Sequence, residues 1–203
     1  MTGKLFIISA PSGAGKTSLA RALIANTENA MMSVSHTTRQ KRAGETEGVD
    51  YFFVDQAMFL KMVSDNVFLE YAQVYGNYYG TSRLAVEEML AKGINVMLDI
   101  DWQGARKVRE QMPKAISISI LPPSIDELER RLRCRGSDTE DVIRSRMSQA
   151  IDEMRHCNEA DLIVMNDEFN AALDDLSMIL SGQSANIRAL NTNLDELLSV
   201  YSD

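Results

Sequence analysis

Residues 9–17 read Ser-Ala-Pro-Ser-Gly-Ala-Gly-Lys-Thr and combine glycines, a lysine and a hydroxyl at a spacing suited to binding phosphate groups. Gly13 and Gly15 let the backbone curl so that successive N–H groups point at one anion. Lys16 adds a mobile positive charge for the β- and γ-phosphates, and the Thr17 hydroxyl is a suitable Mg²⁺ ligand. An apolar run precedes the loop and a helix-like run follows it. This strand–turn–helix layout is typical of a phosphate-binding P-loop.

One position departs from the usual pattern G-x-x-x-x-G-K-[ST], because Ala10 stands where the first glycine is expected. Alanine there implies that the position does not need a positive φ, and Pro11 beside it already restricts the turn. The alternative interpretation of the segment is a strand–helix turn that merely needs glycine. This loop alone does not distinguish a phosphate-binding loop from a structural turn, so motifs elsewhere in the chain are needed.

Two acids end another apolar run, residues 94–99. Asp99 and Asp101 project to the same side as long as the chain stays extended. Carboxylates at the carboxyl end of a parallel strand lie beside the crevice where ligands bind, and there Asp99 could hold Mg²⁺ through a water. The alternative is a pair of solvated acids at a strand end.

Arg39 and Arg42 lie in a polar run that has no helical or strand period. With Ser35, Tyr51 and Tyr79 they could form a second phosphate site, because arginine offers a planar fork that matches phosphate oxygens and the hydroxyls add neutral donors. The alternative is a solvated basic loop, which two arginines alone would favour.

Glu45 and Glu70 need a different explanation, since carboxylates repel phosphates. A carboxylate can accept two hydrogen bonds at once, and guanine offers adjacent N1–H and N2–H donors. Glu70 lies on a β-like stretch and could therefore face a base pocket. By sequence physics alone, a surface glutamate is at least as good an interpretation.

Residues 130–135 hold four arginines, and Gly-Ser-Asp follows them. This composition indicates a mobile lid whose arginines neutralise charge during phosphoryl transfer and whose closure excludes water. The alternative is a solvated helix face stabilised by pairs four residues apart. Those pairs would be Asp126–Arg130, Glu127–Arg131 and Glu129–Arg133.

The composition of the 203 residues, 45% hydrophobic and 25% charged, is that of an ordinary soluble single domain. A net charge of −8 argues against nucleic acid or an acidic membrane as the main partner, while the clustered arginines favour a small, highly charged anion. The two cysteines and two histidines form no metal-ligand pattern. Without a membrane-length apolar run or a signal-type N-terminus, we expect a cytoplasmic protein with reduced thiols.

Short apolar strands separated by helices predict an α/β fold with a parallel sheet covered on both faces. The expected strands are 4–9, 94–99, 115–121 and 162–165. The expected helices are 15–26, 82–92, 102–111, 140–157 and 168–181, with a further helix capped by Ser124. Residues 35–80 look like a small α+β insertion with a loop at 35–45, β-like segments at 49–54 and 68–75, and a helix at 56–65. Residues 184–201 form a possible terminal helix that packs on the core or on another subunit.

Taken together, the ordered motifs resemble the bacterial type of the guanylate kinase family. The resemblance covers residues 4 to about 180. It rests on Ala-Pro-Ser-Gly-Ala-Gly-Lys-Thr, Val-Ser-His-Thr-Thr-Arg, Gly-Glu, Asp-Tyr-Phe-Phe-Val, Gly-Asn-Tyr-Tyr-Gly-Thr-Ser, Leu-Asp-Ile-Asp-Trp-Gln-Gly, Leu-Pro-Pro-Ser, Arg-Gly-Ser-Asp-Thr-Glu and Asn-Asp at 166–167.

The resemblance implies a P-loop three-layer α/β fold and the reaction ATP + GMP = ADP + GDP with Mg²⁺, which would recycle GMP and supply GDP and GTP. It places Ser35, Arg39, Arg42, Tyr51 and Tyr79 on the GMP phosphate, and Glu70 and Thr81 on guanine with Glu45 and Asp101 in support. It places Lys16, Thr17, Arg131, Arg135 and Arg146 on the ATP phosphates and Asn166 near adenine, with Ser12, Gly13, Ala14, Gly15 and Ser18 completing the loop. The expected catalytic residues are Lys16, Arg39, Arg131, Arg135 and Arg146.

Three moving parts are implied as well: a core of residues 1–34, 81–125 and 157–203, a GMP-binding lobe of residues 35–80, and a lid of about residues 126–156.

A rival interpretation is a guanylate-kinase-like binding module that recognises peptides, but such modules have a degraded phosphate loop, whereas Gly15, Lys16 and Thr17 are intact here. A different nucleoside-monophosphate kinase is the nearer alternative, and the choice between GMP and dGMP stays open. Bacterial relatives often self-associate, so a homo-oligomer is also an expectation.

Overall fold

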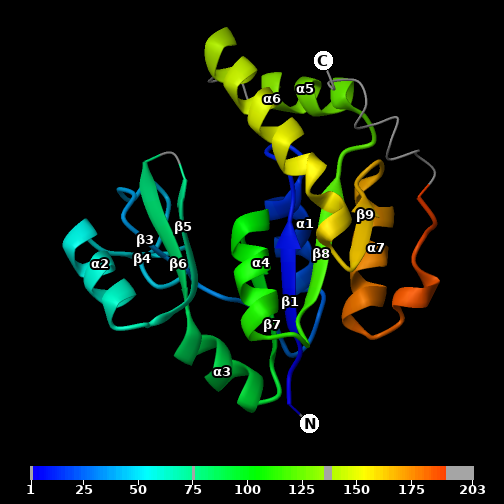
Figure 1. The fold of residues 1–203 in the computed structure, drawn as a ribbon. Helices are drawn as coiled ribbons and strands as arrows, with labels where there is room; N and C mark the ends of the chain where they lie inside the picture. Colours follow the sequence, from blue (N-terminus) through cyan, green and yellow to red (C-terminus); the bar gives the residue numbers. More distant parts are fainter. Residues whose placement is uncertain (1, 75, 135–138, 191–203) are drawn as a thin grey trace. The chain divides into compact units, whose positions relative to one another are not determined.

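The computed structural model describes residues 2–74, 76–134 and 139–190. Its fold is mixed α/β with a parallel central sheet, as predicted (Figure 1). The chain divides into two compact units. The first contains the residues up to Ile7 together with Asn29–Ala115, and the second contains Ile8–Glu28 together with the described residues from Ile116 onward. Strand β1 (Leu5–Ser9) therefore contributes residues to both units.

In the first unit the parallel strands follow the order β2-β7-β1. Strand β2 (Ala30–Met32) pairs with β7 (Asn95–Asp99), with Ala30 opposite Asn95. Helices α3 (Arg83–Ala91) and α4 (Trp102–Gln111) supply apolar residues to the core of this unit. That core consists of Leu5, Ile7, Leu69, Val86, Val96, Leu98, Ala105, Val108 and Ala115.

The first unit also holds a four-stranded sheet with the order β4-β3-β6-β5. Its strands are β3 (His36–Thr37), β4 (Phe52–Phe53), β5 (Phe68–Val74) and β6 (Asn77–Ser82), and helix α2 (Gln56–Ser64) accompanies them. Two details differ from expectation. The loop predicted at 35–45 begins with β3, and the β-like segment 49–54 forms only the two-residue strand β4.

Strand β6 was not predicted, and Gly80 explains why. Glycine weakens a strand pattern in sequence, but in a structure it often marks a close approach. A Cβ atom at Gly80 would lie 2.9 Å from Cδ1 of Phe68 and 3.0 Å from Cζ of Phe59. The glycine therefore lets β6 pass close to two aromatic rings that stack on each other at 4.6 Å.

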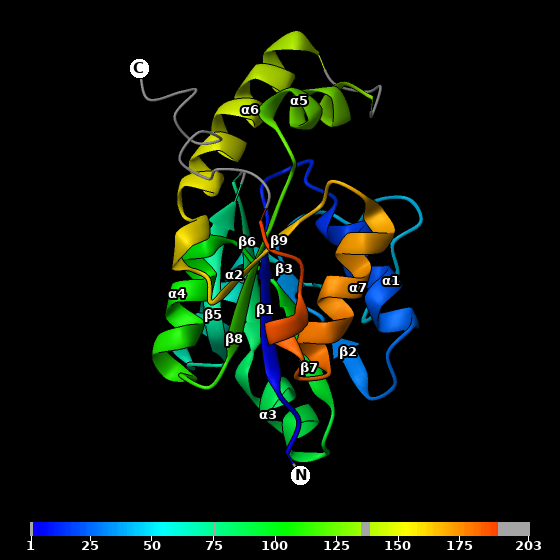
Figure 2. The same cartoon turned by 90° about the vertical axis from the view of Figure 1, so that its right-hand side faces the viewer.

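In the second unit the parallel strands follow the order β1-β8-β9, and β8 (Ile116–Leu121) pairs with β9 (Leu162–Met165). The helices are α1 (Lys16–Ala25), α5 (Ile125–Arg133), α6 (Glu140–Arg155) and α7 (Phe169–Leu180). Figure 2 shows α7 beside α1. Helices α5 and α6 pack through a cluster of Leu121, Ile125, Leu128, Leu132, Ile143, Met147, Ala150, Met154, Cys157 and Met165.

Beyond α7 the described chain does not form the long terminal helix expected at 184–201. Ser184–Asn186 make one 3₁₀ turn, and residues 187–190 have no regular structure. The remainder of that expected helix lies outside the described residues. Of the described helices, none is long and apolar enough to cross a membrane.

Candidate functional site

The backbone of the phosphate loop has the geometry that its glycines predicted. Gly13 and Gly15 have φ values of +98° and +94°, which side chains with a Cβ rarely adopt. Ala10 does not have a positive φ, so alanine fits where glycine is usual. Helix α1 begins at Lys16 behind Gly15, which offers no side-chain cap. The N–H groups of the first helical turn are therefore directed at the loop, where they favour an anion.

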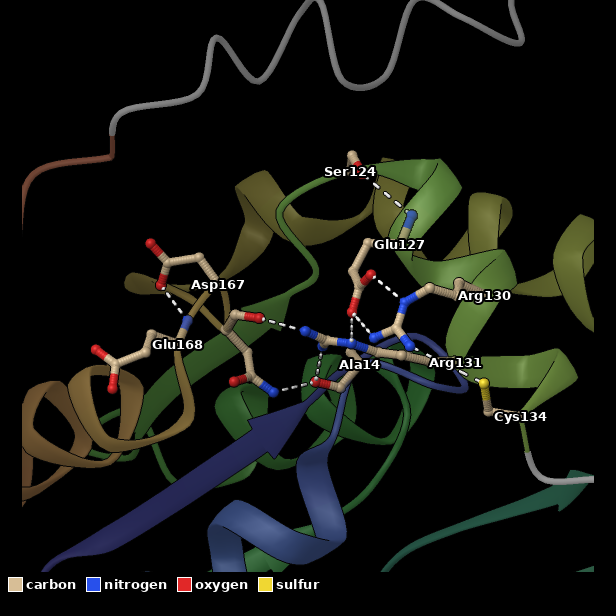
Figure 3. A network of polar contacts seen from close by, with 9 residues as sticks. Ala14, Ser124, Glu127, Arg130, Arg131, Cys134, Asp167 and Glu168 are labelled. Atoms are coloured by element: carbon tan, nitrogen blue, oxygen red, sulfur yellow. Dashed lines mark hydrogen bonds and ion pairs between the residues drawn. The ribbon is translucent and has the colours of Figure 1, made fainter.

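A hydrogen-bond network fixes the loop from the side of Ala14 (Figure 3). Asn166 Nδ2 donates to the Ala14 carbonyl oxygen at 2.6 Å, and Arg131 Nη1 donates to the same oxygen at 3.5 Å. Arg131 Nη2 also donates to the carbonyl oxygen of Asn166 at 2.9 Å. The structure thus brings together three residues predicted for the ATP side.

Arg131 makes the ion pair of the helix-face interpretation, and its role in phosphoryl transfer stays a prediction. Its Nε donates to Glu127 at 2.8 Å, which is the predicted pair four residues apart, while Nη1 donates to Ala14 of the phosphate loop and Nη2 to the Asn166 carbonyl. Hydrogen bonds from Arg130 and Arg131 lower the pKa of Glu127 to about 2. Glu127 therefore stays ionised and fixes the direction of the Arg131 fork.

Helix α5 begins with the predicted cap, since the Ser124 hydroxyl accepts from the Glu127 N–H at 3.1 Å. Arg133 pairs with Glu129 as expected and also with Glu140 of α6. Arg130 pairs with Glu127, three residues away, in place of the expected pair with Asp126.

Glu153 of α6 contacts the loop although nothing in the sequence singled it out. Its Oε2 accepts a hydrogen bond from the Ser12 N–H at 3.1 Å. On an amphipathic helix, one glutamate among several carries no motif that distinguishes it. The contact comes from residues 141 positions apart, and sequence spacing does not reveal it.

The other residues predicted for the ATP side are placed as follows. Lys16 is half-buried at the start of α1, Thr17 and Ser18 are exposed beside it, and Arg146 is half-buried on α6. Arg135 lies outside the described residues. The roles assigned to all four described residues stay predictions.

The first unit contains a buried carboxylate at Glu70, which is only 5% exposed. The Thr81 hydroxyl on β6 donates to Glu70 Oε1 at 2.6 Å, and that residue is itself 1% exposed. Burial raises the pKa of Glu70 to about 7, with Asp101 adding to the rise, while the Thr81 hydrogen bond and Lys107 act against it. Glu70 is therefore not the surface glutamate of the alternative interpretation.

Helix α4 approaches Glu70 closely and holds its strand. A Cβ atom at Gly104 would lie 2.9 Å from Glu70 Oε2. Lys107 Nζ donates to the Tyr71 carbonyl at 2.7 Å, and Gln111 Nε2 donates to the Leu69 carbonyl at 2.8 Å. The residues on both sides of Glu70 are thus tied to one helix. Sequence reasoning missed Lys107 and Gln111, because only strand pairing and helix packing bring them to β5.

Asp101 begins this helix, and its Oδ1 accepts from the Gly104 N–H at 2.8 Å. The backbone of Asp101 is extended, as expected, and the helix starts at the next residue, Trp102. Asp99 is the exposed last residue of β7. The described residues contain no cluster of three or more His, Cys, Asp or Glu side chains around a metal position.

Arg39 and Glu45 form the centre of a polar cluster in the four-stranded part of the first unit. Arg39 Nη2 lies 2.6 Å from Glu45 Oε1, with side chains 13% and 19% exposed. The Glu45 hydrogen bond raises the pKa of Arg39, and the Arg39 hydrogen bond lowers the pKa of Glu45. The Arg39 guanidinium lies 5.3 Å from the Tyr51 ring centre, and the Tyr51 and Tyr79 rings are 5.9 Å apart.

Arg42 and Ser35 border this cluster by their backbones. The Arg42 N–H donates to Glu45 Oε2 at 2.8 Å, and the Ser35 carbonyl accepts from the Phe52 N–H at 2.9 Å. Glu45 thus orients Arg39 and the turn that carries Arg42. The solvated-loop alternative fails for Arg39, whereas the Arg42 side chain is exposed.

A comparison with known proteins gives consistent matches over the length of the chain. A family model described as guanylate kinase matches residues 2–183. Guanylate kinases of Yersinia pestis bv. Antiqua (strain Antiqua) and Escherichia coli (strain K12) are each 52% identical over 199 residues, covering 97% of this chain and 96% of the relative. The crystal structure of guanylate kinase from Anaplasma phagocytophilum is 37% identical with a TM-score of 0.74, covering 90% of this chain and 87% of the other.

Proposed function

The chain belongs to the guanylate kinase family, and we propose that it transfers the γ-phosphoryl group of ATP to GMP, producing ADP and GDP. The observation that carries this proposal is the buried Glu70 carboxylate with its Thr81 partner. A buried acid needs donors, and guanine brings two adjacent N–H donors. In the cell the reaction would recycle GMP in the cytoplasm.

The GMP phosphate is proposed to bind Arg39, Arg42, Ser35, Tyr51 and Tyr79. Support comes from the half-buried Arg39, which Glu45 holds on one side and the Tyr51 ring on another. A guanidinium fixed in this way loses little conformational freedom when it meets a phosphate. Asp101 supports the guanine pocket through the start of α4.

The ATP phosphates are proposed to bind the loop of residues 12–18 with Lys16, Arg131, Arg135 and Arg146, and Asn166 is proposed to lie near adenine. Mg²⁺ would arrive with the nucleotide, neutralising phosphate charge, and its proposed protein ligands are the Thr17 hydroxyl and, through water, Asp99. The Thr17 hydroxyl suits such an ion. Thr17 is exposed beside the loop, and Mg²⁺ in phosphate-transfer sites typically takes one or two protein oxygens together with phosphates and waters.

In the proposed mechanism the GMP phosphate oxygen attacks the γ-phosphorus in line. The acceptor oxygen is already anionic, so no general base is needed. Lys16 and the arginines compensate the charge on the transferred group, and backbone N–H groups of the loop hold the phosphates that stay with ADP. Positioning and electrostatic stabilisation therefore supply the rate acceleration.

The deciding experiment is a coupled assay of ADP formation from ATP and Mg²⁺ with GMP, dGMP, AMP, UMP or CMP as acceptor. We expect turnover with GMP, and little with acceptors that lack the guanine donor pair. Equal turnover with AMP would overturn the assignment of Glu70 to guanine. A folded protein without turnover on any acceptor would favour the peptide-binding rival.

A further inference from the structure

Arg188, which follows helix α7 in the sequence, ties the end of β9 to that helix. Its Nε donates to Asp175 Oδ2 at 2.7 Å, and its backbone N–H donates to Asp175 Oδ1 at 3.0 Å. The Nη atoms of the same guanidinium contact the end of β9 and the residues that follow it. Nη2 donates to the Met165 carbonyl at 3.0 Å, and Nη1 donates to Asp167 Oδ1 at 3.0 Å.

Burial makes this bridge strong at one end. The Asp175 side chain is 6% exposed, so its charge needs a partner, and Arg188 supplies it with two hydrogen bonds. Asp167 at the other end is 44% exposed. Arg188 is thus anchored on α7, and its remaining donors hold the chain that follows β9.

The segment held by Arg188 is the same one that contacts the phosphate loop. Met165 and Asp167 bind Arg188, while Asn166 between them binds Ala14 and Arg131. Consecutive residues therefore face opposite partners. A displacement of the segment by loss of Arg188 must move Asn166 as well.

The contact of Asn166 with the loop leaves little room for such a displacement. Its Nδ2 lies 2.6 Å from the Ala14 oxygen, and a Cβ atom added to Gly15 would lie 2.4 Å from the same nitrogen. The loop and Asn166 are therefore close-packed. Close-packed protein interiors transmit small shifts to their neighbours.

We infer that Arg188 is a positioning residue for the ATP side of the reaction: it acts through residues 165–167 and sets the place of Asn166 against the phosphate loop. The inference rests on the proposed function, because it takes ATP as the nucleotide of that loop. Arg188 itself touches neither the loop nor, in this proposal, the substrate. Its loss acts on ATP and leaves GMP binding intact.

The variant that tests the inference is Arg188→Lys. Lysine keeps a positive charge beside Asp175, which protects the fold, but it lacks the fork that reaches Met165 and Asp167 together. We expect the KM for ATP to rise about five- to tenfold, the effect of about one lost hydrogen bond of ordinary strength, with the KM for GMP changed less than about twofold. Calorimetric binding of ATP should weaken by a similar factor.

Two further variants separate positioning from general stability. Ile179→Val shortens a buried side chain on the same helix without touching the bridge, so it should lower Tm but leave both KM values unchanged. Asn166→Ala removes the Nδ2 hydrogen bond to Ala14 that Arg188 is inferred to set, and it leaves the backbone carbonyl contact with Arg131 in place. In the double variant, Arg188→Lys should therefore add little to the rise in KM for ATP.

Three results would overturn the inference: a parallel rise of both KM values in Arg188→Lys, no change in either, or full additivity with Asn166→Ala. Failure of the proposed function looks different. In that case the unsubstituted chain itself would show no turnover with ATP and GMP. An active wild-type protein without a split between the two KM values rejects the role of Arg188 alone.

Discussion

The Thr81 hydroxyl donates to the Glu70 carboxylate over 2.6 Å inside the first unit. Thr81 satisfies Oε1, whereas Oε2 faces the backbone of Gly104, where no side chain intervenes. Burial holds the pKa of this carboxyl at about 7, so near neutral pH it exists in both protonation states. Only the ionised form can accept two hydrogen bonds from guanine without donating one itself.

Glu70→Gln should raise the KM for GMP at least about tenfold and leave the KM for ATP nearly unchanged. The amide places a donor where guanine presents donors, and a buried unpaired donor costs about 1–3 kcal/mol. Steady-state kinetics with each nucleotide varied in turn measure the split. Equal losses for both nucleotides would contradict a guanine-reading role.

The KM for GMP should rise as the pH falls below about 7. A carboxyl whose pKa is raised to about 7 gains a proton in this range, and the protonated form no longer accepts both guanine donors. The GMP phosphate also titrates, with a second pKa of about 6. Glu70→Gln provides the control, because the GMP phosphate still titrates in this variant whereas the residue at position 70 no longer does. Identical pH profiles for the two proteins would exclude Glu70 as the titrating group.

The same shift makes a prediction about stability. The folded-state pKa of about 7 exceeds the reference value of 4.5, so the folded protein binds more protons between these values. Stability from this group is therefore greatest below about pH 4.5 and falls as the pH rises to about 7, by on the order of 3 kcal/mol. Glu70→Gln should thus be more stable relative to wild type at pH 8 than at pH 5. Urea denaturation at both values measures this difference, and a constant difference would refute it.

Lys16→Ala should lower kcat at least about a hundredfold while the fold survives, because the lysine charge stabilises the transferred phosphoryl group. Turnover and Tm should be measured together. Lys92→Ala at the exposed end of α3 is the matched control, and it should leave both unchanged. Near wild-type turnover in Lys16→Ala would reject the loop as the phosphate-transfer site.

Features that depend on nearby residues were predicted well from the sequence. The loop glycines and the Ser124 cap follow from chain-local geometry, and the structure confirms them together with the apolar strands predicted at 115–121 and 162–165. Strand β6 was missed because Gly80 weakens its pattern. In the structure a Cβ atom at this position would lie too close to the Phe68 ring.

Long-range partners could not be predicted in the same way. Arg188 meets Met165 across 23 positions, and Lys107 meets Tyr71 across 36. Nothing in composition or period marks those residues, because their contacts are set by how helices pack on strands. The sequence indicated which residues could bind phosphate or a base. Only the packing of helices on strands shows which other side chains hold those residues in place.

Gly104→Ala tests whether helix α4 sets the place of the guanine-reading carboxylate. A methyl group at this position would lie 2.9 Å from Glu70 Oε2 and 3.4 Å from Asp101 Oδ1, so the carboxylate has to move. Alanine is also a better helix former than glycine by about 1 kcal/mol, and this gain should offset part of the stability lost through the close contact. We therefore expect a raised KM for GMP, an unchanged KM for ATP and a Tm within a few degrees of wild type.

The matched control for this prediction is the next residue, Ala105→Gly. It has the opposite effect on helix propensity and adds no atom near Glu70, so it should lower Tm and leave the KM for GMP unchanged. If the KM for GMP rises wherever Tm falls, in either variant, then α4 affects GMP binding only through the stability of the fold. If Gly104→Ala alone raises the KM, the close approach of this helix is what holds Glu70 in its working position, since the added methyl group is the only new contact.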